Sequence, residues 1–169
     1  MNGAVNWRNG GAGNFSDSGQ RLGQRDSTAV ALADLDGDGD LDALVGAEKG
    51  ASLWANQGGA QGGKEGTFAL LEQAMSADQT RAVFLADLDE DGDLDALLGG
   101  RRLATIWWND GQAKFVRDRQ KFRYSKRHGL AIADFNGDGR LDIFAAAYDD
   151  DYRVWFNQGD GIFQNTSRL

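Results

Sequence analysis

Three nine-residue loops place oxygen-bearing side chains at the spacing that a hard cation requires. Each loop has Asp or Asn at positions 1, 3, 5 and 9 and glycine at position 6, and the loops cover residues 34–42, 87–95 and 134–142. This spacing lets a short loop curl around one calcium ion, with the backbone carbonyl of position 7 completing the shell. Without a cation the neighbouring carboxylates would repel one another. Acidic turns that match by chance are the alternative, and three copies disfavour it.

The predicted ligand set is therefore three groups of five residues, one for each Ca²⁺ ion. Position 7 is counted for its backbone carbonyl, so its side chain can vary. The groups are Asp34, Asp36, Asp38, Asp40 and Asp42; Asp87, Asp89, Asp91, Asp93 and Asp95; and Asp134, Asn136, Asp138, Arg140 and Asp142.

An EF-hand also begins with this pattern, but it requires a bidentate Glu at position 12. Position 12 holds Val45, Leu98 and Ala145, none of which can bind a cation through its side chain. Short apolar runs flank every loop, such as 29–33 before the first and 41–45 after it. Such runs around a Gly-rich turn are typical of buried strands in a hairpin, although periodicity by itself does not exclude short helices.

A second motif, Trp-x-Asn followed by a Gly-rich turn and Phe, recurs between the loops and decides between strands and helices. Each Phe precedes the first Asp of the next loop by 19 residues (15 to 34, 68 to 87 and 115 to 134). The repeat is about 47 residues long and accommodates four strands, which is the signature of a β-propeller blade. The copies are Trp7, Asn9 and Phe15; Trp54, Asn56 and Phe68; Trp107, Asn109 and Phe115; and Trp155, Asn157 and Phe163.

With these motifs the chain resembles the FG-GAP/VCBS repeats, which form the blades of integrin α-subunit propellers. The resemblance covers nearly the whole chain and implies an all-β propeller with calcium in its loops, including Asp34, Asp36, Asp38 and Asp42. It also implies that position 7 binds through its backbone, which explains Arg140. One departure is that the family's Gly-Ala-Pro reads Gly46-Ala47-Glu48, because the chain has no proline.

Counting strands predicts about three and a half blades of four antiparallel strands in a single segment of 169 residues. A seven-bladed ring would need about twice this length. The chain is therefore expected to be a fragment of a larger propeller or a protomer whose ring is completed in a homo-oligomer. The predicted units are a half blade over 4–20 and blades over 28–74, 80–122 and 128–169.

Strands that alternate in direction would place the calcium loops and the Asn-Gly turns at one face. The turns between the second and third strands, and the connectors between blades, would share the other face, where the resemblance implies a protein or glycan partner. Loops that vary on a constant frame suit this role. The charged residues expected there are Arg101, Arg102 and Asp149–Asp151 in turns and Arg21, Arg25, Arg81, Lys126, Arg127 and His128 in connectors.

The stretch Lys114–His128 is strongly basic and permits two interpretations. One is a polyanion site, for instance for a sulphated or acidic polysaccharide. The favoured one is an outermost strand protected from edge-to-edge pairing, because Arg117, Arg119, Lys121 and Arg123 would alternate onto one face. Nucleic acid is disfavoured because the rest of the domain is acidic.

The repeated Trp residues invite a lectin hypothesis, but their constant position in each blade favours core packing. Trp108 is the exception, because it follows Trp107 and must face the other side of the sheet. No nucleophile lies beside a general base in the pattern, and most acids are assigned to metal, so we expect no enzyme. We expect instead a calcium-binding module for adhesion or protein interaction. The alternatives are a glycan-binding lectin and a non-catalytic appendage of a larger secreted enzyme.

Composition fits an extracellular or cell-surface module. The formal net charge is −8, and the loops supply 4 + 4 + 3 = 11 of the 26 acidic residues as side-chain ligands. Three calcium ions would change the net charge to −8 + 6 = −2. The chain has no Cys, shows no signal peptide, and has no apolar run long enough to insert in a membrane. Because cytosolic calcium is scarce, weak multi-carboxylate sites are useful mainly outside cells.

Overall fold

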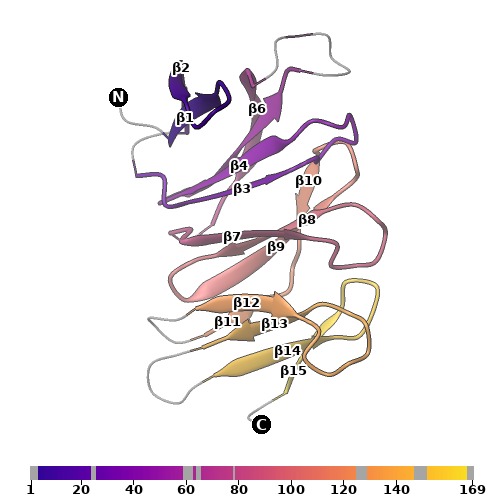
Figure 1. Ribbon diagram of the computed structural model, residues 1–169. Helices are drawn as coiled ribbons and strands as arrows, with labels where there is room; N and C mark the ends of the chain where they lie inside the picture. The colour runs from indigo at the N-terminus through magenta and orange to yellow at the C-terminus, as the bar shows by residue number, and fades with distance from the viewer. Residues whose placement is uncertain are drawn as a thin grey trace.

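The computed structural model describes residues 4–23, 26–58, 63, 66–77, 79–124, 129–146 and 152–166. Every regular element in these residues is a β-strand, and every pairing between strands is antiparallel. The sheets are stacked as successive layers from the N-terminus to the C-terminus (Figure 1). The chain is therefore a partial β-propeller of about three and a half blades, as the repeat predicts.

The first full blade contains four strands in the order of the chain. They are β3 (Ala29–Ala33), β4 (Asp42–Ala47), β5 (Gly50–Asn56) and β6 (Phe68–Met75). Strand β4 is buried along most of its length, because it lies inside the sheet and both of its faces are covered. This explains why the run after each loop is apolar without alternation.

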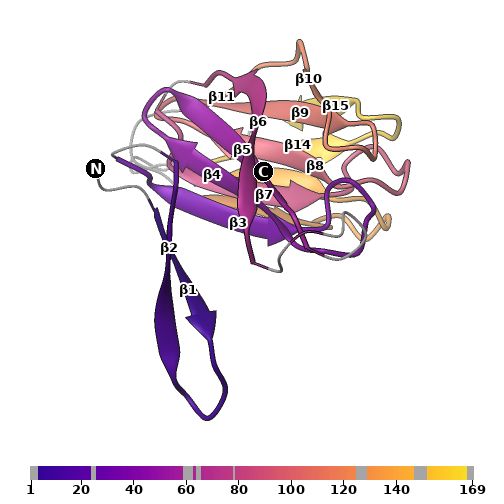
Figure 2. The same cartoon turned by 90° about the horizontal axis from the view of Figure 1, so that it is seen from above.

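The second and third blades repeat this order. The second contains β7 (Ala82–Ala86), β8 (Asp95–Gly99), β9 (Leu103–Asn109), β10 (Phe115–Arg117) and β11 (Phe122–Arg123), and the third contains β12 (Leu130–Ala133), β13 (Asp142–Ala145), β14 (Arg153–Asn157) and β15 (Phe163–Thr166). Before them, β1 (Ala4–Asn9) and β2 (Phe15–Leu22) form a two-stranded sheet. Figure 2 shows this hairpin extending away from the stack.

The prediction of a continuous basic outer strand is wrong in its middle part, because the outer strand of the second blade is broken there. Both β10 and β11 pair with β9, and the segment 118–121 between them leaves the sheet. Consequently Arg119 and Lys121 do not alternate along a strand with Arg117. The carboxylate of Asp118 accepts a hydrogen bond from the Gln120 side-chain amide at 2.6 Å, which holds this segment in a compact bulge.

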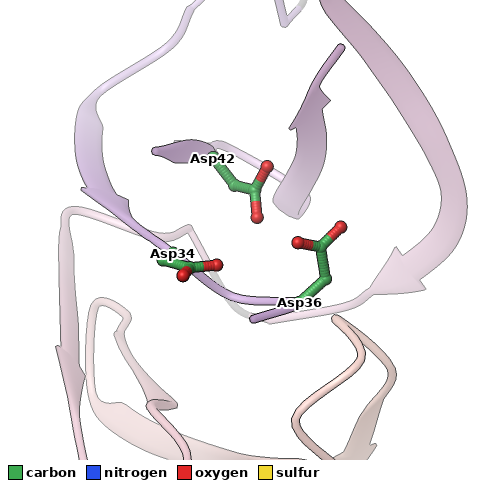
Figure 3. A group of neighbouring side chains, drawn as sticks. All are labelled: Asp34, Asp36 and Asp42. Atoms are coloured by element: carbon green, nitrogen blue, oxygen red, sulfur yellow. The ribbon is translucent and has the colours of Figure 1, made fainter. Parts of the chain in front are cut away.

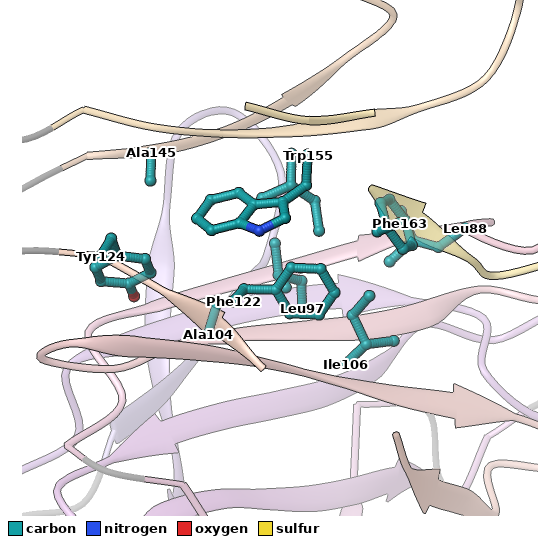
Figure 4. Close-up of a cluster of buried hydrophobic side chains, with 10 residues drawn as sticks. Leu88, Leu97, Ala104, Ile106, Phe122, Tyr124, Ala145, Trp155 and Phe163 are labelled. Carbon is teal, nitrogen blue, oxygen red and sulfur yellow. The ribbon is translucent and has the colours of Figure 1, made fainter. Parts of the chain in front are cut away.

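The core lies between blades. One cluster joins the second and third blades through Ile106, Phe122, Trp155 and Phe163 (Figure 4), and the Phe122 ring meets the other two rings edge-on at 5.6 and 5.5 Å. A second cluster packs Leu35, Leu44, Leu53 and Met75 of the first blade against Trp107, Phe115 and their neighbours in the second. Each blade thus buries its apolar face against the one before it.

The repeated Trp residues follow this rule, so core packing is confirmed for the full blades. Trp107 and Trp155 are only 6% and 4% exposed, and Trp54 packs against the cluster formed by Leu22, Ala43 and Val45. The prediction is wrong for Trp7, which is 57% exposed. No preceding blade lies against β1 among the described residues, so the contact that buries the other rings is missing there.

A glutamine five residues after each of the first three motif Phe residues ties its blade to the next, a contact that the sequence analysis missed. The side-chain oxygen of Gln20 accepts a hydrogen bond from the backbone N–H of Phe68 at 3.0 Å. Gln73 accepts in the same way from Phe115 at 3.1 Å, and Gln120 accepts from Phe163 at 2.9 Å. The recurring Phe-x4-Gln pattern was the available signal. Its meaning depends on which strands become neighbours across blades.

We expect the substitution Gln73→Leu to lower the free energy of unfolding by about 1–3 kcal/mol, because it leaves the Phe115 N–H without an acceptor between two blades. The melting temperature should fall by roughly 2–4 °C per kcal/mol for a chain of this size. Gln112→Leu is the matched control, since Gln112 is exposed in a turn. Equal melting temperatures for the two variants in a thermal denaturation series would contradict a role for this bond.

Candidate metal sites

The first two Asp-rich loops each bring three carboxylates to one point. Oxygens of Asp34, Asp36 and Asp42 all lie within 4.8 Å of one another, and Figure 3 shows these three carboxylates converging from the loop and the start of β4. The corresponding residues of the second loop, Asp87, Asp89 and Asp95, meet the same condition. These residues are loop positions 1, 3 and 9; the predicted ligands at position 5, Asp38 and Asp91, are not members of either group. The three carboxylates of each group are thus close enough together to bind one small hard cation.

The aspartate at loop position 9 is the buried and firmly held carboxylate of each loop. Asp42, Asp95 and Asp142 have no exposed surface. In the second loop, Asp95 accepts hydrogen bonds from the backbone N–H of Leu88 at 3.0 Å and of Asn109 at 2.9 Å. Asp42 and Asp142 accept the equivalent pairs in their own blades. One carboxylate therefore joins the loop to the third strand of its blade.

Position 1 shapes the loop by accepting from two backbone N–H groups. Asp34 binds the N–H of Gly37 at 2.8 Å and of Gly39 at 3.0 Å, and Asp87 and Asp134 bind positions 4 and 6 in the same way. Positions 3 and 5 each accept from the N–H two residues further on, in all three loops. These local bonds wind the backbone so that its side-chain oxygens face inward.

The tight winding requires a left-handed backbone at loop positions 4 and 6. At position 6, φ is 91°, 96° and 90° in the three loops, a conformation that glycine adopts most easily, and all three loops have glycine there. At position 4 the first and third loops also have glycine, but the second has Glu90 at φ 68°. Glu90 is one of few non-Gly residues in this conformation, and its side chain has a partner described below.

Burial and the neighbouring carboxylates raise the pKa of several of these carboxyls. Burial raises the pKa of Asp95 to about 7, against the opposing effect of its two backbone hydrogen bonds. Burial, together with the neighbouring charges, also raises the pKa of Asp36, Asp42 and Asp89. Among the described ion pairs, none involves Asp87, Asp89 or Asp95. A bound divalent cation would supply the missing positive charge, so these residues fit the metal that the sequence predicts.

The third loop is electrostatically different. Its Arg140 Nε lies 3.1 Å from Glu90 Oε2 of the preceding blade's loop, and its guanidinium is 3.6 Å from Asp138 Oδ2. The amide of Asn136 also donates to Asp138 at 3.0 Å. Four backbone hydrogen bonds, foremost that from Gly139, lower the pKa of Asp134. This loop already holds one positive charge of its own, which weakens its attraction for a cation.

The Asn of the Trp-x-Asn motif connects each site to its neighbour, a role that sequence reasoning missed. The Asn109 side chain donates to the carbonyl of Leu35 in the first loop at 2.9 Å. Asn157 donates to Leu88 in the second loop at 2.8 Å. The recurring Asn was visible in the sequence as a turn residue, but its acceptor lies 74 and 69 residues away. Consecutive loops are therefore mechanically linked at one end of the stack (Figure 1).

The other predicted surface residues have mixed outcomes. Arg101 and Arg102 are exposed in the turn between β8 and β9, and Arg81 is exposed before β7. Arg21 is not in a connector as predicted; it lies in β2, where its guanidinium pairs with Asp17 at 2.7 Å. The remaining predicted residues, Arg25, Lys126, Arg127, His128 and Asp149–Asp151, lie outside the described residues.

Comparison with known proteins agrees with this architecture. The family model described as "FG-GAP-like repeat" matches residues 2–45, 34–98, 87–145 and 134–169. The chain therefore belongs to the FG-GAP-like repeat family. None of the curated proteins compared with the chain matches it. No helix in the described residues is long and apolar enough to cross a membrane.

One similar solved structure is a lectin of Agrocybe aegerita that is described as specifically recognising non-reducing terminal N-acetylglucosamine. The two structures superpose with a TM-score of 0.61 at 23% sequence identity, over 97% of this chain and 46% of the lectin. The chain thus spans less than half the length of that protein. At this identity the likeness shows the shared fold and nothing of the ligand.

The raised carboxyl pKa values predict an unusual pH dependence of the calcium-free protein. The folded state binds protons more tightly than the unfolded state, so the free energy of unfolding should rise as the pH falls from about 8 toward about 5. Thermal denaturation in EDTA at several pH values measures this trend. The substitution Asp95→Asn should reduce the rise in the free energy of unfolding at lower pH, because it removes the carboxyl with a pKa of about 7. A melting temperature that instead increases from pH 6 to pH 8 would contradict the assignment.

Proposed function

We propose that this chain is a calcium-binding, non-enzymatic propeller module that serves extracellular adhesion or protein interaction, with calcium in a structural role. The observation that carries the proposal is the convergence of three carboxylates in each of the first two loops, one of them fully buried. Hard oxygen ligands in a flexible loop are the chemistry that calcium prefers. Family membership supports the same function, because these repeats build propeller scaffolds.

The three ions would be held by the side chains of loop positions 1, 3, 5 and 9 and by the position 7 carbonyl. Calcium would neutralise the crowded carboxylates and brace the loop that joins the first two strands of each blade. Because Asn109 and Asn157 hold the preceding loop, bracing one loop also steadies the interface with the next blade. The extracellular location belongs to this proposal, since calcium is abundant there.

We expect calcium to raise the melting temperature and EDTA to reverse the effect. At ten times its dissociation constant, each site adds about 1.4 kcal/mol to the free energy of unfolding. Native mass spectrometry should count up to three ions. The third loop should fill last, because Asn136 and Arg140 make it the least negative of the three. Asp36→Ala should remove one ion, while Glu72→Ala, an exposed acid in β6, should remove none. Identical ion counts and melting temperatures with and without calcium would refute the proposal.

A second candidate function is glycan binding, supported by Trp108. This ring is only partly buried and lies at the seam of the second and third blades. It rests against Gly161, where an added Cβ would be 2.9 Å from the ring, and the Cβ of Asp89 is close to the same point. An aromatic ring beside a polar loop is a suitable stacking surface for a sugar. The partner surface of the first candidate is the opposite face, with Arg81, Arg101 and Arg102.

A glycan array separates the two candidates. Saturable binding to a defined glycan that is lost in Trp108→Ala would favour the lectin, provided that the variant keeps its melting temperature within a few degrees. Arg101→Gln is the matched control, since it lies in a turn at the other end of the blade. No binding on the array, together with capture of a protein partner that Arg101→Gln weakens, would favour the adhesion module.

A further inference from the structure

The outer edge of the second blade carries a dense group of cations, which we name the basic rim. Its members are all exposed: Lys114, Arg117, Arg119, Lys121 and Arg123. With Asp118 as the one acid, residues 114–123 carry a formal charge of 5 − 1 = +4 in a chain whose net charge is −8. Figure 2 shows β10 and β11 along one edge of the stack.

This charge is specific to the second blade. The outer strand β6 contains one charged residue, Glu72, and β15 contains none. In β2 the two charged residues, Asp17 and Arg21, neutralise each other in an ion pair of 2.7 Å. If the cations served only to prevent edge-to-edge pairing, the continuous outer strands would need them most. Instead they lie on the one outer strand that is already broken by a bulge.

The cations of the basic rim are not paired with acids of the described residues. None of them forms an ion pair in the described part of the chain. The carboxylate of Asp118, the nearest acid in sequence, accepts from the backbone N–H of Arg119, from the backbone N–H of Gln120 and from the Gln120 side chain. These bonds turn Asp118 inward toward its own loop. The guanidinium and ammonium groups therefore face solvent.

The bulge that presents these cations is anchored to the next blade. Gln120 accepts from the N–H of Phe163 at 2.9 Å and donates to the carbonyl of Gly161 at 2.7 Å. Residues 117–121 line an open depression at this place. Arg117 is further restrained, since its Cζ lies 6.0 Å from the centre of the Trp107 ring. Ordering of this kind lowers the entropy lost on binding an anion.

We propose that the basic rim binds a sulfated polysaccharide. Sulfate groups along a sugar chain match arginine forks, which bind oxyanions in a bidentate manner. Single-stranded nucleic acid also requires exposed aromatic platforms. The aromatic residues in and directly after this segment, Phe115, Phe122 and Tyr124, are only 5%, 1% and 6% exposed and pack in the core. The rim is distinct from the Asp-rich loops, so the proposal does not depend on the proposed calcium sites.

The test measures binding of dextran sulfate to the calcium-saturated chain at about 0.05 M salt, with neutral dextran as the ligand control. The double variant Arg119→Gln/Lys121→Gln should bind at least tenfold more weakly. For this variant, the slope of log K (the association constant) against log salt concentration should be less steep by about one to two, because up to two ionic contacts are removed. The control Lys49→Gln removes an exposed lysine from the β4–β5 turn, and its affinity for dextran sulfate should stay within twofold of the parent's. The affinity of Lys121→Gln should lie between those of the parent and the double variant.

Three results would overturn the proposal. The first is no binding to dextran sulfate at this salt concentration, or equal binding to neutral dextran. The second is an equal loss of affinity in Lys49→Gln and Lys121→Gln, which would attribute binding to overall charge. The third is tighter binding of a single-stranded oligothymidine of the same total charge, which would assign the rim to nucleic acid. Thermal denaturation of each variant shows that the fold is retained.

Discussion

The structure depends on one buried carboxylate in each blade. The aspartate at loop position 9 is fully buried, and it holds the loop with one oxygen and the third strand with the other. This arrangement is costly without a cation, because a buried carboxylate resists ionisation, as the raised pKa of Asp95 indicates. The same residue that gives the blade its shape therefore creates the demand for positive charge. In the proposed function, this side chain would both shape the blade and favour a bound cation.

The blades are joined by a repeated set of contacts. At the loop end, the Asn side chain reaches the carbonyl of the preceding loop. At the outer edge, the Gln side chain binds the first N–H of the following blade's outer strand. Between these polar contacts the Trp and Phe rings fill the apolar layer. The hydrogen bonds fix the register of stacking, while burial of the rings supplies most of the stabilising free energy.

Departures from the repeat mark the places where the blades differ in chemistry. In the third loop, Arg140 replaces the aspartate of position 7 and pairs with Glu90, so one inter-blade contact is an ion pair. In the second blade, the outer strand opens into a bulge that presents cations on an otherwise acidic domain. Both changes leave the buried framework intact, because they occur at exposed or partly exposed positions. A constant frame with variable exposed positions suits a module that binds partners.

The sequence alone determined the all-β repeat, the blade length, the loop ligand spacing and the family resemblance. These follow from local rules: the glycine conformation at position 6, the alternation of apolar runs and turns, and the constant distance between motifs. Only the tertiary structure decided how Asn109, Gln73 and Arg140 are used, because their partners lie 42 to 74 residues away in neighbouring blades. It also decided that residues 118–121 leave the sheet and that Trp7 is exposed. Burial and charge pairing depend on which surfaces meet, and a linear pattern does not contain that information.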